Sequence, residues 1–449
     1  MFEFGRELKR ILGAAAQAGK GLEGTDPSLM ELMDQTILLG AARTATVKGG
    51  TVSASDRHSR YLEAAMCWRE YARRTGEAEA VRKAASAAES AGKLAETRQQ
   101  AAEAALEQAL TCITGSDLYD APELLTTAEN LIAEGRGGAE DCPYLKACYD
   151  LAGARVTARL ALGRQDEDLT LSAAAQYDQA IKALDALAKA SDLPRDRVTA
   201  AFARTERADL LLAIGWRQSE VRILGPVLHD LLQLMRRLSS DYEPISYNRT
   251  KELCGVAHVY LGQLEKDGEI IAEGVAMLSS LELQVNRDHS PLDWVGQQHA
   301  LALGLQALAE ICDSDEAFDK AVKVFDMALE KPLAQSLSLR ATVANNRAAC
   351  LARRAERTGD LAALKAAENG FKSELDLIRP EQDPVSWAVI QANLGRLYLA
   401  REKLIGKSTD RVAAAYAFEI ARDIFADHGL KNLADTAADG LNEALSAGA

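Results

Sequence analysis

The sequence contains few residues of the kinds that build strands or interrupt helices. Only ten of its 449 residues are proline, and aromatic residues make up 5% of the chain. Alanine, leucine, glutamate and arginine, which favour helices, are frequent instead. Runs of β-branched and aromatic residues, which strands need, are scarce. The composition therefore predicts an all-α protein.

Long hydrophobic runs are also missing. The longest apolar stretch, LLLAIGW at residues 210–216, is far shorter than the roughly 18 residues that a membrane-spanning helix needs. The opening residues, MFEFGRELKRILGAAA, include Glu3 and Glu7 and lack the apolar core of a secretory signal. We therefore expect a cytoplasmic protein.

Cysteine is present but follows no recognisable scheme. The chain has seven cysteines, an odd number, and none of them forms a C-x-x-C pair. Scattered cysteines of this kind do not indicate a disulfide framework. We expect them to be small buried hydrophobic residues in a reducing compartment.

Positive charge is in deficit. Lysine and arginine number 52 against 66 aspartates and glutamates, which gives a formal net charge of −14. A protein that binds the phosphate backbone of nucleic acids needs concentrated positive charge. The balance therefore argues against nucleic acid as a general partner.

Motifs for catalysis, cofactors or metals are equally scarce. GKST at 406–409 resembles the end of a phosphate-binding loop, but Arg401 stands where that motif needs a glycine. DSDEAFD at 313–319 resembles a calcium loop, but Ala317 and Phe318 replace an oxygen ligand and a glycine. Acidic residues at a helix N-terminus explain that segment better. No G-x-S-x-G or H-E-x-x-H sequence occurs, so we predict no catalytic residue, metal ligand or cofactor.

Two tryptophans reveal an internal repeat. Trp294 and Trp387 each follow a proline by three residues and precede a glutamine by four, and they lie 93 residues apart. Two periods of 46 or 47 residues fit that distance. The stretch LSLRATVANNRAACLARRAE begins halfway and places Asn346 47 residues before Asn393. We therefore predict helices that begin near residues 292, 338 and 385.

A second amphipathic helix follows each of these opening helices. The segments 315–331, 361–378 and 410–425 carry apolar residues at the three- and four-residue spacing of one helical face. Small residues such as Ala317 and Ala321 allow paired helices to approach closely. Because one such pair cannot bury its apolar face alone, neighbouring pairs must stack.

Residues 290–430 resemble the tetratricopeptide repeat in a long-period bacterial form. The matching pattern consists of Leu394, Gly395, Tyr398, Ala414, Phe418 and Ala421. Trp387 lies about one turn earlier than the family pattern has it, and the linker between the helices is longer. The resemblance implies an all-α, right-handed solenoid of antiparallel helix pairs. We therefore expect Trp387, Leu394 and Tyr398 to pack between helices rather than to wall a ligand site.

Weaker helix pairs extend the pattern towards the N-terminus. We predict pairs at 143–163 with 169–190, 196–216 with 225–238, and 247–265 with 269–283, and two further pairs before residue 140. The chain then divides into an amphipathic helix and Gly-rich tether at 1–24, a divergent helical-repeat region at 25–245, tetratricopeptide-like repeats at 246–430, and a capping helix and tail at 431–449.

The resemblance also implies where a partner binds. In the family, the opening helices line a concave groove, and an asparagine just before Leu-Gly often hydrogen-bonds a bound peptide. Asn346 and Asn393 match that position here. Arg347, Arg353 and Arg396 lie close to them in the sequence, and arginine pairs well with carboxylates. We predict that these five residues form a peptide-binding groove, with backbone capping as the alternative role for the asparagines.

The first residues form a second candidate site. Apolar residues at helical spacing share this stretch with three cations on the other side, and the set comprises Phe2, Phe4, Arg6, Leu8, Lys9, Arg10, Ile11 and Leu12. Such a helix is typical of proteins that lie on an anionic membrane surface. The alternative is a helix that caps the first repeat.

These features favour a non-enzymatic scaffold or adaptor that binds a protein segment or peptide in the groove. We expect it in the bacterial cytoplasm, with peripheral contact to the inner membrane if the N-terminal helix binds lipid. A regulatory receptor that senses a peptide is the second interpretation, and an enzyme with a superhelical recognition arm is the third. The sequence does not identify the partner.

Overall fold

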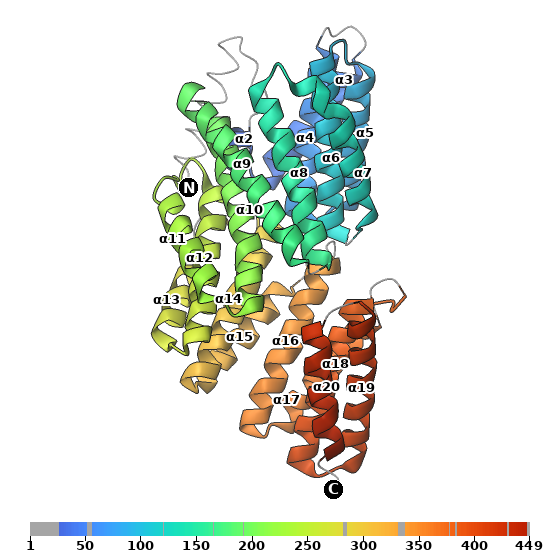
Figure 1. Ribbon diagram of the computed structural model, residues 1–449, viewed down its shortest axis with the longest axis vertical. Helices are drawn as coiled ribbons and strands as arrows, with labels where there is room; N and C mark the ends of the chain where they lie inside the picture. The colour runs from blue at the N-terminus through green and yellow to red at the C-terminus, as the bar shows by residue number, and fades with distance from the viewer. Residues whose placement is uncertain are drawn as a thin grey trace. The chain divides into compact units, whose positions relative to one another are not determined.

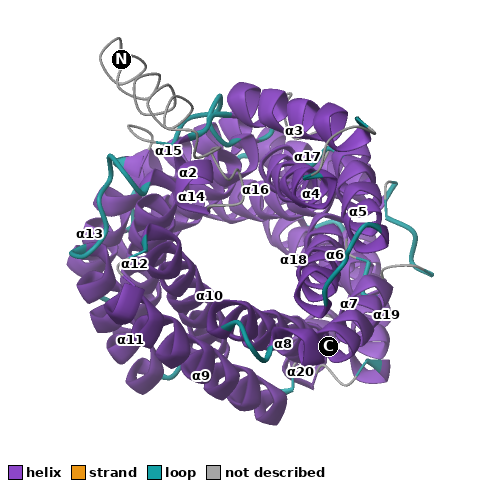
Figure 2. Ribbon diagram, turned by 90° about the horizontal axis from the view of Figure 1, so that it is seen from above, coloured by secondary structure: helices purple, strands orange, loops and turns teal. Residues whose placement is uncertain are grey.

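The computed structural model describes residues 27–446, apart from 52–55, 120, 165, 192, 282–284, 331–336, 377, 382–383 and 429–430. This part of the chain contains nineteen α-helices and one short 3-10 helix (Figure 1). Figure 2 shows helices and loops but no strand in the same residues. Within them, no helix is both long enough and apolar enough to span a bilayer. The predicted N-terminal helix at 1–24 lies outside the described residues.

The chain divides into two compact units. Unit 1 comprises Met1–Cys254 with Leu281–Trp294, and unit 2 comprises Gly255–Ser280 with Val295–Ala449. The helices up to the first boundary are α2 (Pro27–Leu32), α3 (Gln35–Gly50), α4 (Arg57–Thr75), α5 (Ala78–Lys93), α6 (Arg98–Tyr119), α7 (Glu123–Gly135), η1 (Arg136–Ala139), α8 (Pro143–Arg164), α9 (Glu167–Ser191), α10 (Pro194–Gln218), α11 (Val221–Met235) and α12 (Pro244–Glu265). The remaining helices are α13 (Gly268–Ser279), α14 (Pro291–Cys312), α15 (Asp315–Ala328), α16 (Leu337–Thr358), α17 (Leu361–Leu375), α18 (Pro384–Ile405), α19 (Ser408–Asp427) and α20 (Lys431–Ser446).

Most helices that are consecutive in the chain pack side by side, and several also meet the next helix but one. In unit 1, α4 packs on α6, α6 on α8, and α8 on α10; in unit 2, α16 packs on α18, and α18 on α20. Within unit 1, α4, α6, α8 and α10 therefore form one layer, and within unit 2, α16, α18 and α20 form one. We call the even-numbered helices from α4 onwards the A helices and the odd-numbered helices from α5 onwards the B helices. The predicted all-α array of stacked helix pairs is confirmed.

The repeat period places the helices correctly. The three opening helices begin at Pro291, Leu337 and Pro384, each within one residue of its predicted start. The pairs predicted upstream correspond to α8 with α9, α10 with α11, and α12 with α13. The two pairs expected before residue 140 are α4 with α5 and α6 with α7. Apolar periodicity therefore located the helix pairs from α4 onwards, whereas it predicted neither α2 nor α3.

Local signals set the helix ends. The side chain of Ser314 accepts a hydrogen bond from the Ala317 N–H at the start of α15, so the acidic segment there is a helix N-terminus, as predicted. Asp360 caps α17 in the same way. Gly359 and Gly406 end α16 and α18 with φ of +68° and +67°, a conformation that glycine adopts without strain. GKST therefore comprises the two-residue linker between α18 and α19 and the first two residues of α19.

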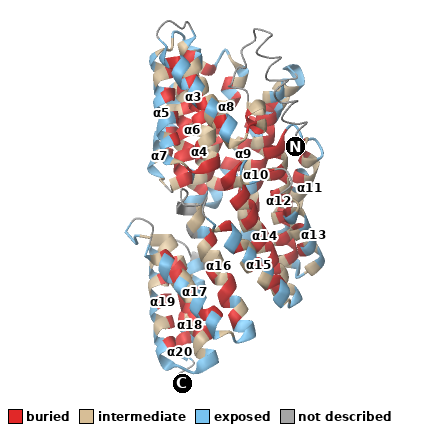
Figure 3. Cartoon of the chain, turned by 180° about the vertical axis from the view of Figure 1, so that it is seen from behind, coloured by how far each residue is buried: buried red, intermediate tan, exposed pale blue. Residues whose placement is uncertain are grey.

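Phenylalanines of the B helices form the centre of the core in unit 2. Phe318, Phe325, Phe371, Phe418 and Phe425 are all buried, and Figure 3 shows buried residues along the faces where helices meet. Leu394 belongs to the core between α16 and α18, and Tyr398 packs half-buried against it. Both residues lie between helices, as the repeat pattern predicts.

Candidate interaction faces

Polar side chains link successive A helices of unit 2. The Asn346 Nδ2 atom on α16 lies 2.8 Å from His299 Nε2 on α14. Asn393 on α18 donates from Nδ2 to Asn345 Oδ1 on α16 at 3.0 Å. These four residues form a row across three helices, which we call the amide row. The repeat period accounts for the first contact, because His299 and Asn346 are 47 residues apart, whereas Asn393 bonds to Asn345, the residue before its own equivalent Asn346.

His299 is a neutral acceptor in the amide row. Burial lowers its pKa to about 4, so the imidazole carries no charge near neutral pH. A neutral ring can accept the Asn346 N–H at Nε2 while Nδ1 keeps its proton. The ring also packs against Phe325, with centroids 6.1 Å apart. The half-buried asparagines keep hydrogen-bonding capacity beyond this row, because each amide has two N–H groups and two lone pairs.

Two of the predicted arginines lie on the same face as the amide row. Arg353 follows Asn346 by two helical turns and pairs with Glu310 of α14 at 3.1 Å. Arg396 follows Asn393 by three residues and makes no ion pair with any residue in the described part of the chain. Burial and the nearby charge of Arg353 lower the pKa of Arg396. An arginine in such a place favours an anionic partner.

Arg396 also lines a small depression. The depression has a volume of about 250 Å³ and is lined by Glu356, Arg396, Leu399, Ala400, Lys403, Leu404 and Glu443. Lys403 is neutralised by Glu443 at 2.8 Å. The lining therefore offers the Arg396 cation, the nearby carboxylate of Glu356 and apolar side chains to a segment with both polar and apolar residues.

Arg347 lies elsewhere. Its guanidinium pairs with Asp326 of the B helix α15, because one residue along α16 turns the side chain about 100° away from Asn346. The structure therefore groups Asn346, Asn393, Arg353 and Arg396 on one face and directs Arg347 towards the neighbouring helix.

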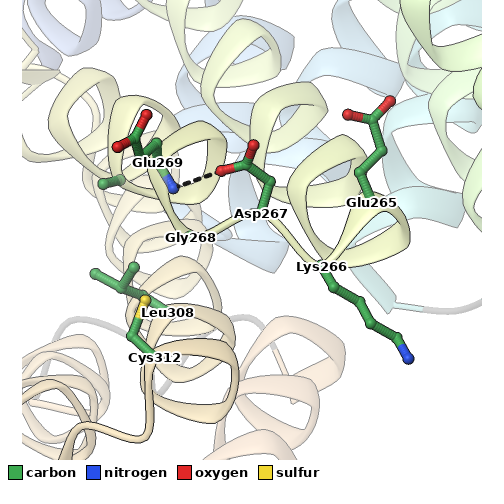
Figure 4. A pocket seen from close by; sticks show the side chains of 8 residues that line it. Glu265, Lys266, Asp267, Gly268, Glu269, Leu308 and Cys312 are labelled. Carbon is green, nitrogen blue, oxygen red and sulfur yellow. Dashed lines mark hydrogen bonds between the residues drawn. The ribbon is translucent and has the colours of Figure 1, made fainter.

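A second depression lies where α12 turns into α13. It has a volume of about 580 Å³ and is lined by Glu265, Lys266, Asp267, Gly268, Glu269, Ala272, Leu308 and Cys312 (Figure 4). Asp267 caps α13 by accepting from the Glu269 N–H at 2.8 Å, so this carboxylate has a structural task. No group of three His, Cys, Asp or Glu side chains in the described residues is placed to hold a metal ion.

Ion pairs join the A helices of unit 1. We call these charged residues the belt: Arg69, Glu70, Arg73, Glu107, Arg155, Glu206, Asp209, Arg249, Glu252 and Asp293. Arg69 of α4 binds Glu107 of α6, and Arg155 of α8 binds Glu206 of α10 at 2.9 Å. Arg249 of α12 binds Asp209 of α10 at 2.8 Å. Each of these pairs links neighbouring A helices.

One further ion pair joins α4 to the start of α14. Arg73 of α4 donates to both carboxylate oxygens of Asp293, at 2.9 and 3.1 Å, although 220 residues separate them. Asp293 also accepts from Ser290 Oγ at 2.6 Å. The start of α14 therefore meets α4 within unit 1. We call this junction the seam.

The short helix α2 is held at the seam. Its Glu31 carboxylate accepts from the Ile245 and Ser246 N–H groups at 3.1 and 3.2 Å, at the N-terminus of α12. His289 Nε2 lies 3.0 Å from the Glu31 carbonyl oxygen, and the fully buried Arg74 donates to carbonyls of the same segment.

Glu31 and His289 titrate in opposite directions. Burial raises the pKa of Glu31 to about 7, although hydrogen bonds from Ser246 act against this. Burial, and then the charge of Arg74, lower the pKa of His289 to about 4. The stabilising contribution of Glu31 is complete below about pH 4.5 and is lost as the pH rises through 7. The contribution of His289 is complete above about pH 6.5 and is lost as the pH falls through 4. The free energy of unfolding therefore changes with pH in opposite directions for the two groups.

Replacing Glu31 by glutamine should reveal how Glu31 changes the free energy of unfolding with pH. We expect the difference in free energy of unfolding between the intact chain and Glu31→Gln to be largest near pH 4.5. It should shrink by up to about 3 kcal/mol towards pH 7.5, because over most of this range the unfolded chain has lost the Glu31 proton while the folded chain still holds it, and glutamine does not titrate. Urea unfolding at pH 4.5, 6 and 7.5 measures the difference. A difference that stays constant or grows with pH would contradict the titration of Glu31.

The comparisons with known proteins leave the chain without a family. No family model matches it, and no curated protein sequence matches it. Among solved structures, the chain is similar to a circular tandem repeat protein with novel repeat topology and enhanced subunit contact surfaces. The identity is 15%, the match covers 92% of this chain and 95% of that one, and the TM-score is 0.26. The fold assignment therefore rests on the helices and contacts described above.

The sequence patterns predicted only part of the amide row and none of the seam. His299 and Asn345 complete the amide row, and the 47-residue spacing between His299 and Asn346 was a signal that could have identified the first of them. The seam carries no such signal, because its residues are distant in the chain and follow no period.

Proposed function

We propose that the chain is a non-enzymatic interaction scaffold and that the A-helix face of unit 2 binds a segment of a partner protein. The observation that supports this most is the amide row, with Arg353 and Arg396 beside it. The row places groups that can bind a peptide backbone at regular intervals, next to groups that bind carboxylates.

The spacing of the row suits an extended segment. Packed helices lie roughly 8–10 Å apart, and an extended chain advances about 3.3 Å per residue. About every third residue of a bound segment would therefore pass the next asparagine. An Asn side chain can donate to a peptide carbonyl and accept from a peptide N–H. Arg396 would then receive an acidic side chain of the segment.

A regulatory receptor is the second candidate, because the same face could bind a peptide and change the packing of the A helices. An enzyme with a recognition arm ranks third, because none of the motifs found in the sequence supplies a nucleophile with its base. A cytoplasmic location in a bacterium belongs to the same proposal. Contact of residues 2–12 with an anionic membrane remains a prediction that vesicle co-sedimentation tests.

The asparagines provide the test of binding. In the variant Asn346→Ala with Asn393→Ala, we expect the affinity for the partner isolated with the intact chain to fall at least tenfold. Helical circular dichroism should stay the same, because the loss of two hydrogen bonds between side chains costs about 1–3 kcal/mol each and leaves the backbone hydrogen bonds of the helices in place. Isothermal titration calorimetry with the purified partner measures the change.

Tyr416→Ala is the matched control. Tyr416 is 66% exposed on the B helix α19, away from the amide row. The Tyr416→Ala variant should bind the partner with the same affinity as the intact chain. Equal loss of affinity in both variants, or no loss in the double variant, would show that the amide row does not carry recognition.

A further inference from the structure

The helix α2 stands outside the pairwise order of unit 1. It has only six residues and packs against α10, whereas α3 packs on α4 and α4 on α5. A helix of six residues is not stable alone in water. Its structure therefore depends on the surface that receives it.

Unit 1 recognises the backbone of this segment. Arg74 of α4 is fully buried and donates to the carbonyl oxygens of Met30, at 2.7 Å, and of Met33. The Met30 carbonyl lies in the last turn of α2 and also accepts from the Met33 N–H, and Met33 directly follows the helix. The Arg74 cation therefore meets the negative end of the helix dipole. Glu70 holds the Arg74 guanidinium in place at 2.7 Å.

Unit 1 also recognises one acidic side chain. The Glu31 carboxylate is 1% exposed and receives two backbone N–H groups and the Ser246 hydroxyl at the start of α12. Because a carbonyl oxygen only accepts, His289 donates from Nε2 to the Glu31 backbone. Met30 and Met33, which flank Glu31 in the sequence, are also buried.

The receiving groups are held without help from α2. Glu70, Arg73, Asp293 and Ser290 bond to one another and fix α4 against the start of α14. The N–H groups that bind Glu31 belong to the first turn of the 22-residue helix α12. The surface under α2 is therefore a preformed site for a short helical segment.

We propose that α2 is a ligand in cis, occupying a site in unit 1 for short helical segments that carry a glutamate between two methionines or similar apolar residues. A segment of the same chemistry from another chain competes with α2 for this site. This binding site is separate from the amide row and does not depend on the function proposed for unit 2.

The test uses the full chain with the substitution Glu31→Lys, which removes the anchor of α2 and leaves the receiving groups unchanged. The probe is a fluorescent peptide with the sequence of residues 27–34, PSLMELMD, and the control peptide carries lysine in place of the glutamate. We expect Glu31→Lys to bind the probe at least tenfold more tightly than the intact chain does, by fluorescence anisotropy. Adding Ser246→Ala should abolish this binding, and the control peptide should not bind. Equal binding by the intact chain and Glu31→Lys, or binding unaffected by Ser246→Ala, overturns the proposal.

Hydrogen exchange of the intact chain gives a second test that needs no variant. A segment that leaves its site without unfolding unit 1 exchanges its amides faster than the surrounding core. We expect the amides of α2, together with those of Ile245 and Ser246, to exchange at least tenfold faster than those in the middle of α10. If α2 and α10 exchange at the same rate, α2 is an integral part of unit 1 and the proposal is wrong.

Discussion

Replacing Glu70 by alanine should lower the free energy of unfolding of unit 1 by about 3–5 kcal/mol. Glu70 pairs with Arg73 at 2.9 Å and with Arg74 at 2.7 Å, and Arg74 has no exposed surface. Burial alone would raise the pKa of Glu70, but the two arginines lower it well below its usual range. Without this carboxylate, Arg74 would remain a buried cation with only carbonyl oxygens as partners, which is the costly way to break a buried ion pair.

Glu79→Ala is the control for this substitution. Glu79 also pairs with an arginine, Arg82, but both side chains lie on the surface of α5. Exposed pairs contribute little, so we expect no measurable change in the thermal transition. Urea unfolding of both variants measures the effects. Similar stability in both would mean that the seam does not hold unit 1 together.

Replacing Phe418 by alanine should cost about 3–5 kcal/mol in unit 2. Phe418 of α19 is 2% exposed and belongs to the core between α18 and α20. Its ring lies against two glycines: a Cβ atom at Gly395 would be 2.9 Å from the ring, and one at Gly440 would be 2.6 Å from it. The three helices pack so closely that they cannot easily collapse into the space that the ring leaves.

Tyr416→Ala on the same helix again serves as the control, because an exposed side chain away from the core changes stability by only about 0.5 kcal/mol. Both variants can be compared by urea unfolding followed by circular dichroism. A loss below about 1 kcal/mol for Phe418→Ala would show that α18, α19 and α20 do not share one core.

The repeat was predictable because its signals are local. The proline and tryptophan that open α14 and α18 recur at twice the period of the array, and Gly395 and Phe418 lie at the places where helices must approach closely. Each helix buries a face that its own apolar spacing defines. Helix starts and helix pairs therefore follow from the sequence with little need of tertiary information.

The seam was not predictable because nothing local specifies it. Arg73 and Asp293 are 220 residues apart, and Glu31 and Ser246 are 215 residues apart. Each residue alone resembles a surface charge or a helix cap. Only the arrangement of the A helices in unit 1 brings them together and buries them.

The candidate site in unit 2 falls between these two cases. The repeat pattern identified Asn346 and Asn393, and the structure places both in one row with His299 and Asn345. The repeat pattern did not distinguish the place of Arg347 from that of Arg353, because the two arginines differ in their direction around α16 rather than in residue type.

Site-specific photo-crosslinking tests the proposed binding face most directly. A photoreactive phenylalanine derivative is placed either at Glu356, exposed in the depression beside Arg396, or at Val412, which is 71% exposed on the B helix α19. Irradiation in the native cells, followed by mass spectrometry, identifies what lies against each position. We predict that position 356 crosslinks to one defined segment of a partner protein, that position 412 does not, and that Asn346→Ala with Asn393→Ala removes the product. A product from position 412 alone, or one from position 356 that the double variant leaves intact, would contradict binding at the A-helix face.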